Sequence, residues 1–206
     1  MSIFRTNSIE ELKEFSERSD QLTILERSPV RGAEAFFEEL MIKPFGFTGE
    51  VFGADAEKNV REILEEKFSS EIESNPFYDS WVLDMVKLCE AFCEMQNSDS
   101  ISFKLGSQRG CRRYHVDFVP LRLLVTYGGK GTELLPDEAA DRDAFENGEA
   151  NEKIVKDSSV IEFMKPWEVA VFHGGPKGIL HRTPDDALNG PSVMMRLDHS
   201  TFGSMK

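Results

Sequence analysis

The apolar residues of this chain repeat with one period before about residue 100 and with another after it. Over residues 8–95 they recur three to four positions apart, the spacing of one helix face, as in the stripe Trp81, Met85, Leu88 and Phe92. After the polar segment 96–100, short runs rich in β-branched and aromatic residues alternate with Gly, Pro and Asp clusters, which is typical of strands and turns. This change of period predicts an α+β protein with helices first and strands last.

Seven strand-like runs are expected in the second half of the chain, at 101–105, 111–118, 121–127, 160–164, 169–174, 178–184 and 192–200. Many short strands in about 100 residues favour a sandwich or barrel. We therefore expect a helical region at 1–99 packed against a strand region at 100–206, as one compact unit. The polar segment 134–159 is expected to be a long loop, and loops of that length in compact domains are usually functional or mobile.

The formal charge of −13 is concentrated in the first half of the chain. Residues 1–100 have 22 acidic and 10 basic side chains, whereas residues 101–206 have 15 and 14. An acidic chain is repelled by nucleic acids and by anionic membrane surfaces, so neither is an expected partner. No apolar run approaches the roughly 20 residues that span a bilayer, which excludes a transmembrane helix.

Three cysteines, an odd number without the spacing of a disulfide framework, indicate a reducing environment. The first residues also lack the charged and then apolar pattern of a signal peptide, so a cytoplasmic protein is expected. Cys89 and Cys93 lie four positions apart on a predicted helix without a nearby partner, and we interpret them as buried helix-face residues.

The motif His115-Val-Asp117 is the strongest candidate for a functional site. In a strand, side chains two positions apart point to the same face, so the imidazole and the carboxylate would converge. A second imidazole would complete the 2-His-1-carboxylate facial triad, which binds non-haem Fe(II) and leaves positions open. His181, in a late strand-like run, is the best third ligand. The competing interpretations are a surface ion pair of Asp117 with nearby arginines and a core histidine at 181 that is bonded to the backbone.

The order of motifs around this pair resembles the prolyl-hydroxylase-like group of iron(II)/2-oxoglutarate oxygenases. His-x-Asp is followed by a strand with Arg and Thr, a Gly-rich turn, a Pro-led strand ending in Phe, a distal His and a late basic residue, over roughly 103–200. The resemblance implies a double-stranded β-helix, that is, a jelly-roll or cupin-like barrel, with Fe(II) and 2-oxoglutarate as cofactors. It gives Arg196 the task of binding the distal carboxylate of 2-oxoglutarate, since arginine can hold a carboxylate with two parallel hydrogen bonds. Arg122 and Arg182 are the alternatives.

The chain also resembles, over most of its length, the bacterial domain-of-unknown-function 1826 family. Its pattern is matched at Cys111, Arg112, His115, Asp117, Arg122, Gly131, Thr132, Glu133, His181, Arg182, Pro184, Arg196 and Asp198. Leu134 stands where the family usually has Trp, a departure at a packing or pocket position. The family does not generally have a histidine at position 173, so His173 is not expected to be a ligand. The family's association with zinc homeostasis keeps Zn(II) as an alternative metal.

Further residues are expected around the metal site. Those assigned to the substrate or to support of the ligands are Tyr114, Thr132, Glu133, Arg113 and Asp198. Cys111 is either a soft fourth ligand that favours zinc or a buried thiol. The basic run Arg109, Arg112 and Arg113 either holds an anionic substrate or balances the acidic helices.

Three functions follow from these features. The first is an Fe(II)/2-oxoglutarate-dependent dioxygenase, an oxidoreductase that hydroxylates an unknown small-molecule or protein substrate. The second is a non-catalytic zinc-binding barrel linked to metal homeostasis, in which a fourth protein ligand closes the site. The third is a metal-free interaction protein whose acidic helical half binds a basic partner. The metal content of the purified protein separates the first two from the third.

Overall fold

The computed structural model describes residues 3–65, 67–188 and 190–202. Its α-helices are α1 Ile9–Lys13, α2 Ala33–Leu40, α3 Ala56–Leu64, α4 Ser70–Glu73, α5 Tyr78–Gln96, α6 Arg142–Glu146, α7 Asn151–Ile154 and α8 Asp185–Leu188. Its strands are β1 Ile3–Thr6, β2 Leu22–Leu25, β3 Gly46–Phe52, β4 Ser100–Gly106, β5 Leu121–Gly128, β6 Glu133–Leu135, β7 Glu162–Phe163, β8 Val169–His173, β9 Leu180–Arg182 and β10 Val193–His199.

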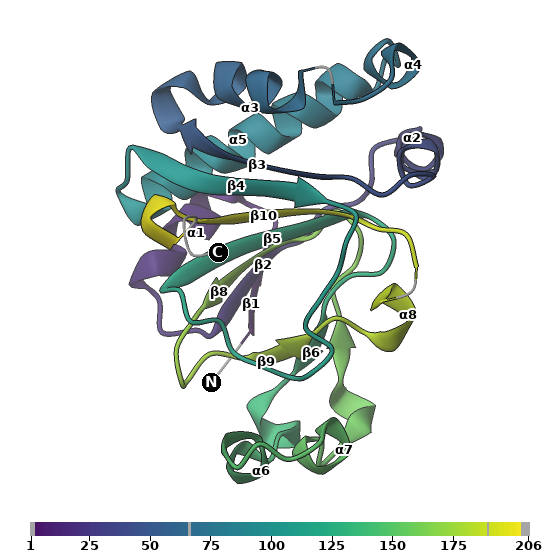
Figure 1. Cartoon of the computed structure of the whole chain (residues 1–206). Coiled ribbons are helices and arrows are strands. Elements are labelled where there is room, and N and C mark those ends of the chain that lie inside the picture. The colour runs from purple at the N-terminus through teal and green to yellow at the C-terminus, as the bar shows by residue number, and fades with distance from the viewer. Residues whose placement is uncertain (1–2, 66, 189, 203–206) are drawn as a thin grey trace.

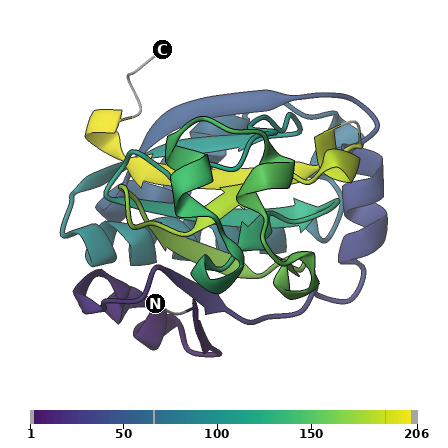
Figure 2. The ribbon, with the colours of Figure 1, turned by 90° about the horizontal axis from the view of Figure 1, so that it is seen from below.

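Two sheets form the body of the molecule. The large sheet has the strand order β1-β2-β8-β5-β10-β4-β3, and only its β1–β2 pair is parallel among the described residues. The small sheet has the order β7-β6-β9. Helices α3 and α5 cover one face of the large sheet, and β6 and β9 lie on its other side (Figure 1). The α6–α7 segment projects beyond the small sheet in Figure 1 and lies in front of the sheets in the view from below (Figure 2).

The largest apolar core lies between the helices and the large sheet. Trp81, Met85, Leu88 and Phe92 of α5 are buried in it, which confirms the predicted stripe, and Cys89 and Cys93 are buried as expected. The helix ends at Asn97, whose backbone is left-handed (φ 47°) and whose N–H binds the carbonyl groups of the last turn. No helix of the described residues is long and apolar enough to cross a membrane.

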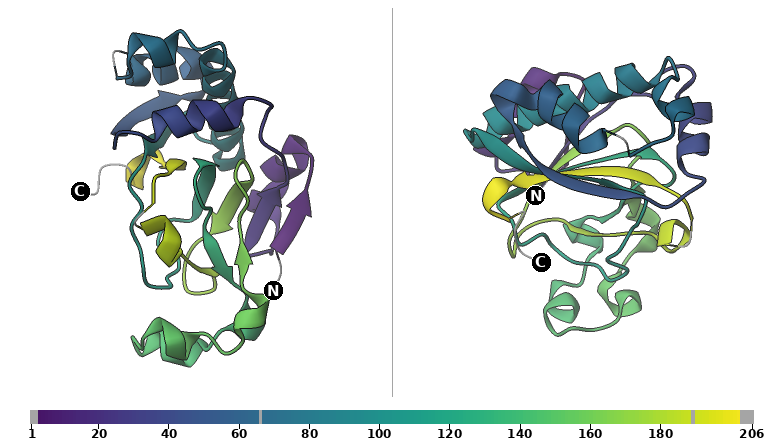
Figure 3. Two further views of the ribbon diagram at one scale, coloured as in Figure 1. Left: turned by 90° about the vertical axis from the view of Figure 1, so that its right-hand side faces the viewer. Right: turned by 45° about the horizontal axis from the view of Figure 1, so that its top comes forward.

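A second apolar core joins the two sheets. Its buried members are Leu22, Ile24, Leu124, Leu134, Met164, Ala170, Phe172 and Ile179. Leu134, where the family usually has Trp, is thus a packing position and fully buried. This core fills the space between β5 and β8 on one side and the small sheet on the other. The left view of Figure 3 shows the ribbons of the two sheets from the side.

The prediction of a helical region at 1–99 is wrong for three segments, although the helical pattern is itself interrupted at residues 43–53, around the third of them. Residues 3–6, 22–25 and 46–52 are the strands β1, β2 and β3, which form both edges of the large sheet. The four residues of β2, Leu-Thr-Ile-Leu, are all buried, so the strand lacks the alternation of buried and exposed residues that marks a half-buried strand. In β3 glycines interrupt the helical pattern, and one of them, Gly49, leaves room for the side chain of Ile63 on α3.

Two predictions about the second half are also wrong. Residues 134–159 are not one long loop, because they contain α6 and α7; Asp141 caps α6 by accepting from Ala144 N–H, and Ile154 is buried. Residues 111–118 do not form a strand, since only His115 makes a β-bridge there. The other expected strands are present, as β4, β5, β7, β8, β9 and β10.

Candidate metal centre

Two histidines from distant parts of the chain meet across a backbone bridge. His115 N–H donates to the carbonyl of His181 (3.1 Å), and His181 N–H donates to the carbonyl of His115 (3.0 Å). His181 lies in the middle of β9, which pairs on its other side with β6. The bridge places the two imidazole rings 4.4 Å apart between their centroids. The predicted convergence of these side chains is therefore present, although the first one does not come from a strand.

The ring orientation of both histidines is set in the same way. Nδ1 of His115 lies 3.1 Å from the carbonyl oxygen of Arg113, and Nδ1 of His181 lies 3.1 Å from that of Ile179, in each case two residues earlier. A carbonyl can only accept, so each Nδ1 is the protonated nitrogen and each Nε2 is left with its lone pair. This hydrogen bond to the second nitrogen is the usual support of a metal-binding histidine.

Asp117 brings a buried carboxylate to the two rings. Its Oδ2 is 3.6 Å from Nε2 of His181 and has no hydrogen-bond partner among the described residues. Its Oδ1 accepts from the guanidinium of Arg122. An unpaired buried carboxylate oxygen is costly unless a cation reaches it, and a metal ion at Oδ2 would remove that cost.

A glycine turn holds the backbone behind Asp117. Gly175 N–H donates to the Asp117 carbonyl (2.7 Å), and Gly174 N–H donates to that of Pro120 (3.0 Å). A Cβ at Gly174 would lie only 1.9 Å from the carbonyl oxygen of Val119, so no larger residue fits. This support was not predicted from the sequence, and the Gly-Gly pair that follows β8 is the signal that could have indicated it.

Metal-binding atoms of His115, Asp117 and His181 all lie within 4.8 Å of one another. Two imidazoles and one carboxylate with an unpaired oxygen fit a divalent metal ion well. Cys111 lines the same cavity but is not a member of this group, and it is exposed rather than a buried thiol. His173 is elsewhere, with Nδ1 2.7 Å from the carbonyl oxygen of Asp20 and its ring stacked on Phe15.

Burial and local charges set the protonation of these groups. Burial lowers the pKa of His181 to about 4, which keeps its ring neutral at neutral pH. The ring of Phe172, with its centroid 4.6 Å away, forms part of that apolar wall. The pKa of His115 is raised, because the hydrogen bond and the charge of Cys111 outweigh the opposing effect of burial. The hydrogen bond with His115 in turn lowers the pKa of the Cys111 thiol.

The three candidate cosubstrate arginines differ in their partners. All three guanidinium nitrogens of Arg122 have carboxylate partners. Nε and Nη2 lie 2.7 Å and 3.2 Å from the Asp198 carboxylate, and Nη1 donates to Asp117. Arg196, on β10, has Nε 2.8 Å from the same Asp198 carboxylate. No hydrogen bond to either terminal nitrogen of Arg196 is present in the described part of the chain, and its side chain lines the cavity.

Arg182 belongs to a separate polar network. Its Nε donates to Glu133 (2.9 Å), its Nη1 lies 3.3 Å from Asp185, and its guanidinium lies over the ring of Tyr114. The Tyr114 hydroxyl also donates to Glu133, and burial together with this hydrogen bond raises the Tyr114 pKa. Glu133 is thus the centre of a buried network beside the histidines, in which two of the three guanidinium nitrogens of Arg182 already have carboxylate partners.

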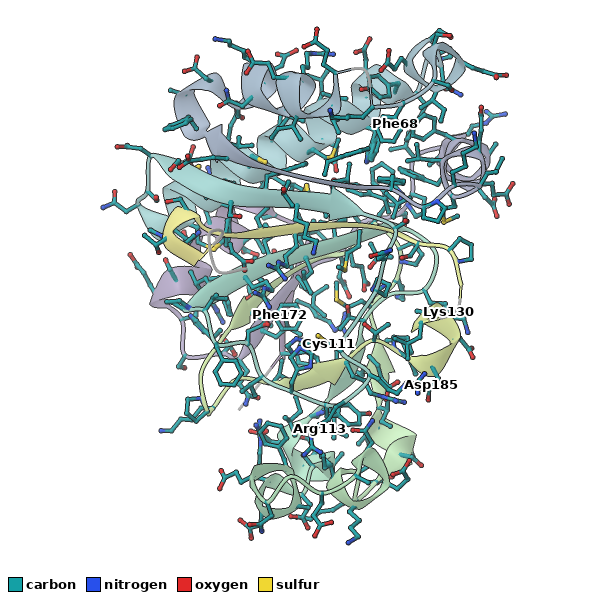
Figure 4. All side chains as sticks on the ribbon, in the orientation of Figure 1. Phe68, Cys111, Arg113, Lys130, Phe172 and Asp185 are labelled. Atoms are coloured by element: carbon teal, nitrogen blue, oxygen red, sulfur yellow. The ribbon has the colours of Figure 1, made fainter. Side chains whose placement is uncertain are left out.

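Of the remaining predicted site residues, Thr132 lies in the cavity and Arg113 lies outside it. Thr132 lines the cavity and its hydroxyl accepts from Arg109. Arg113 points away toward the α6–α7 segment, where it donates to the carbonyls of Gly148 and Phe145. Figure 4 shows this difference, with Cys111 between the two sheets and Arg113 beside α6 and α7.

Comparisons with known proteins identify the family of the chain and its fold. A model of the family described as "Protein of unknown function (DUF1826)" matches residues 6–198. A search of curated protein sequences finds no match.

Solved structures with a similar fold include a dioxygenase for auxin oxidation from rice, with 10% identity, a TM-score of 0.50, and 96% of this chain and 82% of that chain covered. An Fe(II)/α-ketoglutarate-dependent dioxygenase, TqaL, has 10% identity and a TM-score of 0.46, covering 93% and 86%. A dioxygenase for auxin oxidation from Arabidopsis thaliana has 11% identity and a TM-score of 0.42, covering 99% and 95%. At these identities the likeness concerns the fold alone, and among these three it is substantial only for the rice structure.

Proposed function

This chain belongs to the DUF1826 family, and we propose that it is a non-haem Fe(II)- and 2-oxoglutarate-dependent oxygenase that hydroxylates an unidentified substrate. The observation that carries the proposal is the donor set His115, Asp117 and His181, whose metal-binding atoms lie within 4.8 Å of one another. Two imidazoles and one carboxylate are the ligands of the facial triad of such oxygenases. Three protein ligands leave further coordination positions for a cosubstrate and for oxygen.

The fold supports the same proposal. A double-stranded β-helix has two facing sheets, and here the small sheet β7-β6-β9 faces part of the large sheet across a shared apolar core. The fold likeness to the rice dioxygenase, at a TM-score of 0.50, is in keeping with that architecture. The jelly-roll assignment therefore belongs to the proposal together with the oxygenase function.

The residues of the site would have separate tasks. When bound, Fe(II) and 2-oxoglutarate supply oxidation of a substrate C–H bond by oxygen, with decarboxylation of 2-oxoglutarate to succinate and carbon dioxide. Arg122 holds Asp117 in place through Oδ1 and leaves Oδ2 for the metal. Phe172 and the buried wall around His181 keep water from the ligands.

Arg196 is the residue we assign to the distal carboxylate of 2-oxoglutarate. It lines the cavity that contains both histidines, and its terminal nitrogens have no acceptor among the described residues. The two alternatives, Arg122 and Arg182, each bind two carboxylates of the protein. A free guanidinium fork is what a bidentate carboxylate contact requires.

The test is anaerobic reconstitution with Fe(II) followed by titration with 2-oxoglutarate. We expect stoichiometric iron and the weak visible charge-transfer band of the metal chelate, which saturates with 2-oxoglutarate. The matched control is His181→Ala, which should show no band. Stoichiometric zinc in the purified protein without any band after iron loading would contradict the oxygenase proposal.

A second function, a non-catalytic zinc site, is favoured by the position of Cys111. Its thiol is hydrogen-bonded to His115 and has a lowered pKa, so a small movement would add a thiolate as fourth ligand. In that case Cys111→Ser would weaken zinc binding strongly. Under the oxygenase proposal the same variant keeps its iron and its 2-oxoglutarate band.

A further inference from the structure

The cavity at the candidate metal centre is lined by cations in a strongly acidic chain. Its volume is about 210 Å³. The charged side chains in its wall are Lys104, Arg109, Arg122, Arg182 and Arg196, together with His115 and His181, and no carboxylate of the described residues lines it. Because the net charge of the chain is −13, this local excess of positive charge is not a property of the whole surface. It indicates that the cavity receives anions.

Three of the five cations already have carboxylate partners within the protein. Arg122 binds Asp117 and Asp198, and Arg196 shares Asp198. Arg182 binds Glu133 and Asp185. Each of these arginines therefore has at least part of its charge balanced before any ligand arrives.

Lys104 and Arg196 form one pair on the large sheet. They are direct partners in the register of β4 and β10, so their side chains are cross-strand neighbours on the same face. Lys104 is exposed and has no ion pair in the described part of the chain. This pair faces the cavity from the sheet side, and it is where the proposed function places the distal carboxylate of 2-oxoglutarate.

Arg109 lies on a different wall and has no carboxylate partner among the described residues. Its Nη1 donates to the carbonyl of Lys130 (2.7 Å) and its Nη2 to the hydroxyl of Thr132 (3.3 Å), both in the segment between β5 and β6. Burial lowers its pKa to about 10, so the environment of the guanidinium disfavours its charge. A half-buried arginine held by two neutral acceptors is a charge that lacks its counterion.

The sum of the charges at the loaded site leaves Arg109 available for a second anion. Five cationic side chains line the cavity. Four carboxylates that do not line it form ion pairs with them: Asp117, Asp198, Glu133 and Asp185. A divalent metal ion and the divalent anion 2-oxoglutarate cancel one another, so one positive charge remains in the loaded site. We propose that Arg109 and Thr132 bind an acidic group of the substrate, a carboxylate or a phosphate, at a subsite separate from the Arg196–Lys104 pair.

This inference rests on the proposed function only in calling the anion a substrate. The subsite itself is formed by Arg109 and Thr132 and needs no metal. If the iron and 2-oxoglutarate experiment fails and Arg109 still binds an anion, the oxygenase proposal falls and the subsite stands. If the 2-oxoglutarate band forms and Arg109 binds no anion, the oxygenase proposal stands and the subsite is wrong.

The test uses two small probes, inorganic phosphate and acetate, and the Nε–H signals of arginine in ¹⁵N NMR spectra. Each probe is titrated into the metal-free protein and into protein saturated with Zn(II) and 2-oxoglutarate. We expect a saturable shift of the Arg109 signal that persists when 2-oxoglutarate is bound. A higher affinity for phosphate than for acetate would indicate a phosphorylated substrate. A higher affinity for acetate would indicate a carboxylated substrate.

Variants make the assignment specific. Arg109→Gln should weaken probe binding by about tenfold, the loss expected for one charge-assisted contact, while its affinity for 2-oxoglutarate stays unchanged. Arg113→Gln is the matched control, because it removes the same charge four positions away from a guanidinium that does not line the cavity. The inference is overturned if neither probe shifts the Arg109 signal saturably, or if 2-oxoglutarate abolishes the shift, which would make Arg109 the cosubstrate arginine.

Discussion

His115 and His181 are joined by two reciprocal main-chain hydrogen bonds, of 3.1 and 3.0 Å, and each ring also has its Nδ1 at the carbonyl oxygen two residues earlier. The backbone therefore fixes both the position and the tautomer of these side chains before a metal arrives. A preorganised pair of ligands loses little conformational entropy on binding. Asp117 completes the set from a turn held by glycines.

Replacing either histidine should abolish metal binding. In His115→Ala and His181→Ala we expect the metal affinity to fall by more than about 100-fold, beyond the effect of losing a group outside the ligand set. Equilibrium dialysis with metal analysis measures this. His173→Ala is the control, since its ring binds the Asp20 carbonyl away from the site; full metal binding by both site variants would show that the triad is wrong.

Arg122 should be needed for stability as well as for the site. Arg122→Gln would leave Asp117 and Asp198, both buried, without their shared cation, which we expect to cost about 3 kcal/mol in the free energy of unfolding of the metal-free protein. Urea denaturation measures the loss. Arg61→Gln, which removes an exposed arginine with two carboxylate partners, should cost less than about 1 kcal/mol.

Bound metal should restore part of the stability of Arg122→Gln, because it would supply the positive charge that Asp117 has lost. The melting temperature of this variant should therefore rise more on metal addition than that of the wild-type protein. An equal rise in both proteins would mean that Asp117 does not bind the metal.

Gly174 should tolerate no side chain. In Gly174→Ala the new Cβ would meet the carbonyl oxygen of Val119 at 1.9 Å and that of Asp117 at 2.7 Å, so the turn must move. We expect a loss of more than about 2 kcal/mol in stability together with weaker metal binding. The neighbouring Gly175→Ala has open space around its Cβ and a positive φ of 86°, and should cost only about 1–2 kcal/mol. Similar losses in both variants would mean that backbone strain, not the close approach, limits this turn.

Replacing Arg196 by Leu should separate cosubstrate binding from metal binding. We expect the affinity for 2-oxoglutarate to fall by about 10- to 100-fold, the loss of a bidentate charged contact, while iron stoichiometry is retained. Titration of the visible band measures both. Arg112→Leu, an exposed arginine that does not line the cavity, is the control. Unchanged affinity in Arg196→Leu would assign the cosubstrate to another arginine of the cavity.

One of the three thiols should react much faster than the others. Cys111 is exposed and its pKa is lowered, whereas burial raises the pKa of Cys89 and raises that of Cys93 to about 11. Since the thiolate is the reactive form, a disulfide reagent at pH 8 should label one cysteine rapidly in the native protein and three after unfolding. Cys111→Ser should remove the fast phase; a second fast thiol would show that α5 is packed less tightly than its buried face implies.

The sequence predicted the second half of the fold better than the first. The strands β4, β5 and β7 to β10 were recognisable because turn residues separate them. The three-residue strand β6 was missed, since Leu134 and Leu135 were assigned to the loop, and β1 and β2 are only four residues long and could not be distinguished from helix ends. The side chains of His115 and Asp117 do lie close together, but not for the predicted reason, since a bridge to β9 and a glycine turn, not strand alternation, bring them together.

The sequence could not predict which carboxylates form ion pairs with the three candidate arginines. The resemblance favoured Arg196 for the cosubstrate, but spacing along the chain could not choose between the alternatives Arg122 and Arg182, because each lies in a strand of the second half. What separates them is which carboxylates the fold brings next to each guanidinium, and Asp117, Asp198, Glu133 and Asp185 come from four different segments. Such contacts depend on the register of the strands, which short motifs do not specify.

The long sequence separation between β2 and its partner β8 has a consequence for the protein as it is synthesised. β2 pairs with β8, so after Leu25 has left the ribosome its partner is absent until Val169 follows, a delay of about 7–30 s at about 5–20 residues per second. During that time the apolar side chains of Leu22 and Ile24 have no sheet to cover them. We expect the nascent chain to depend on chaperones until the last strands emerge, and folding to be slow and nearly all-or-none when it comes.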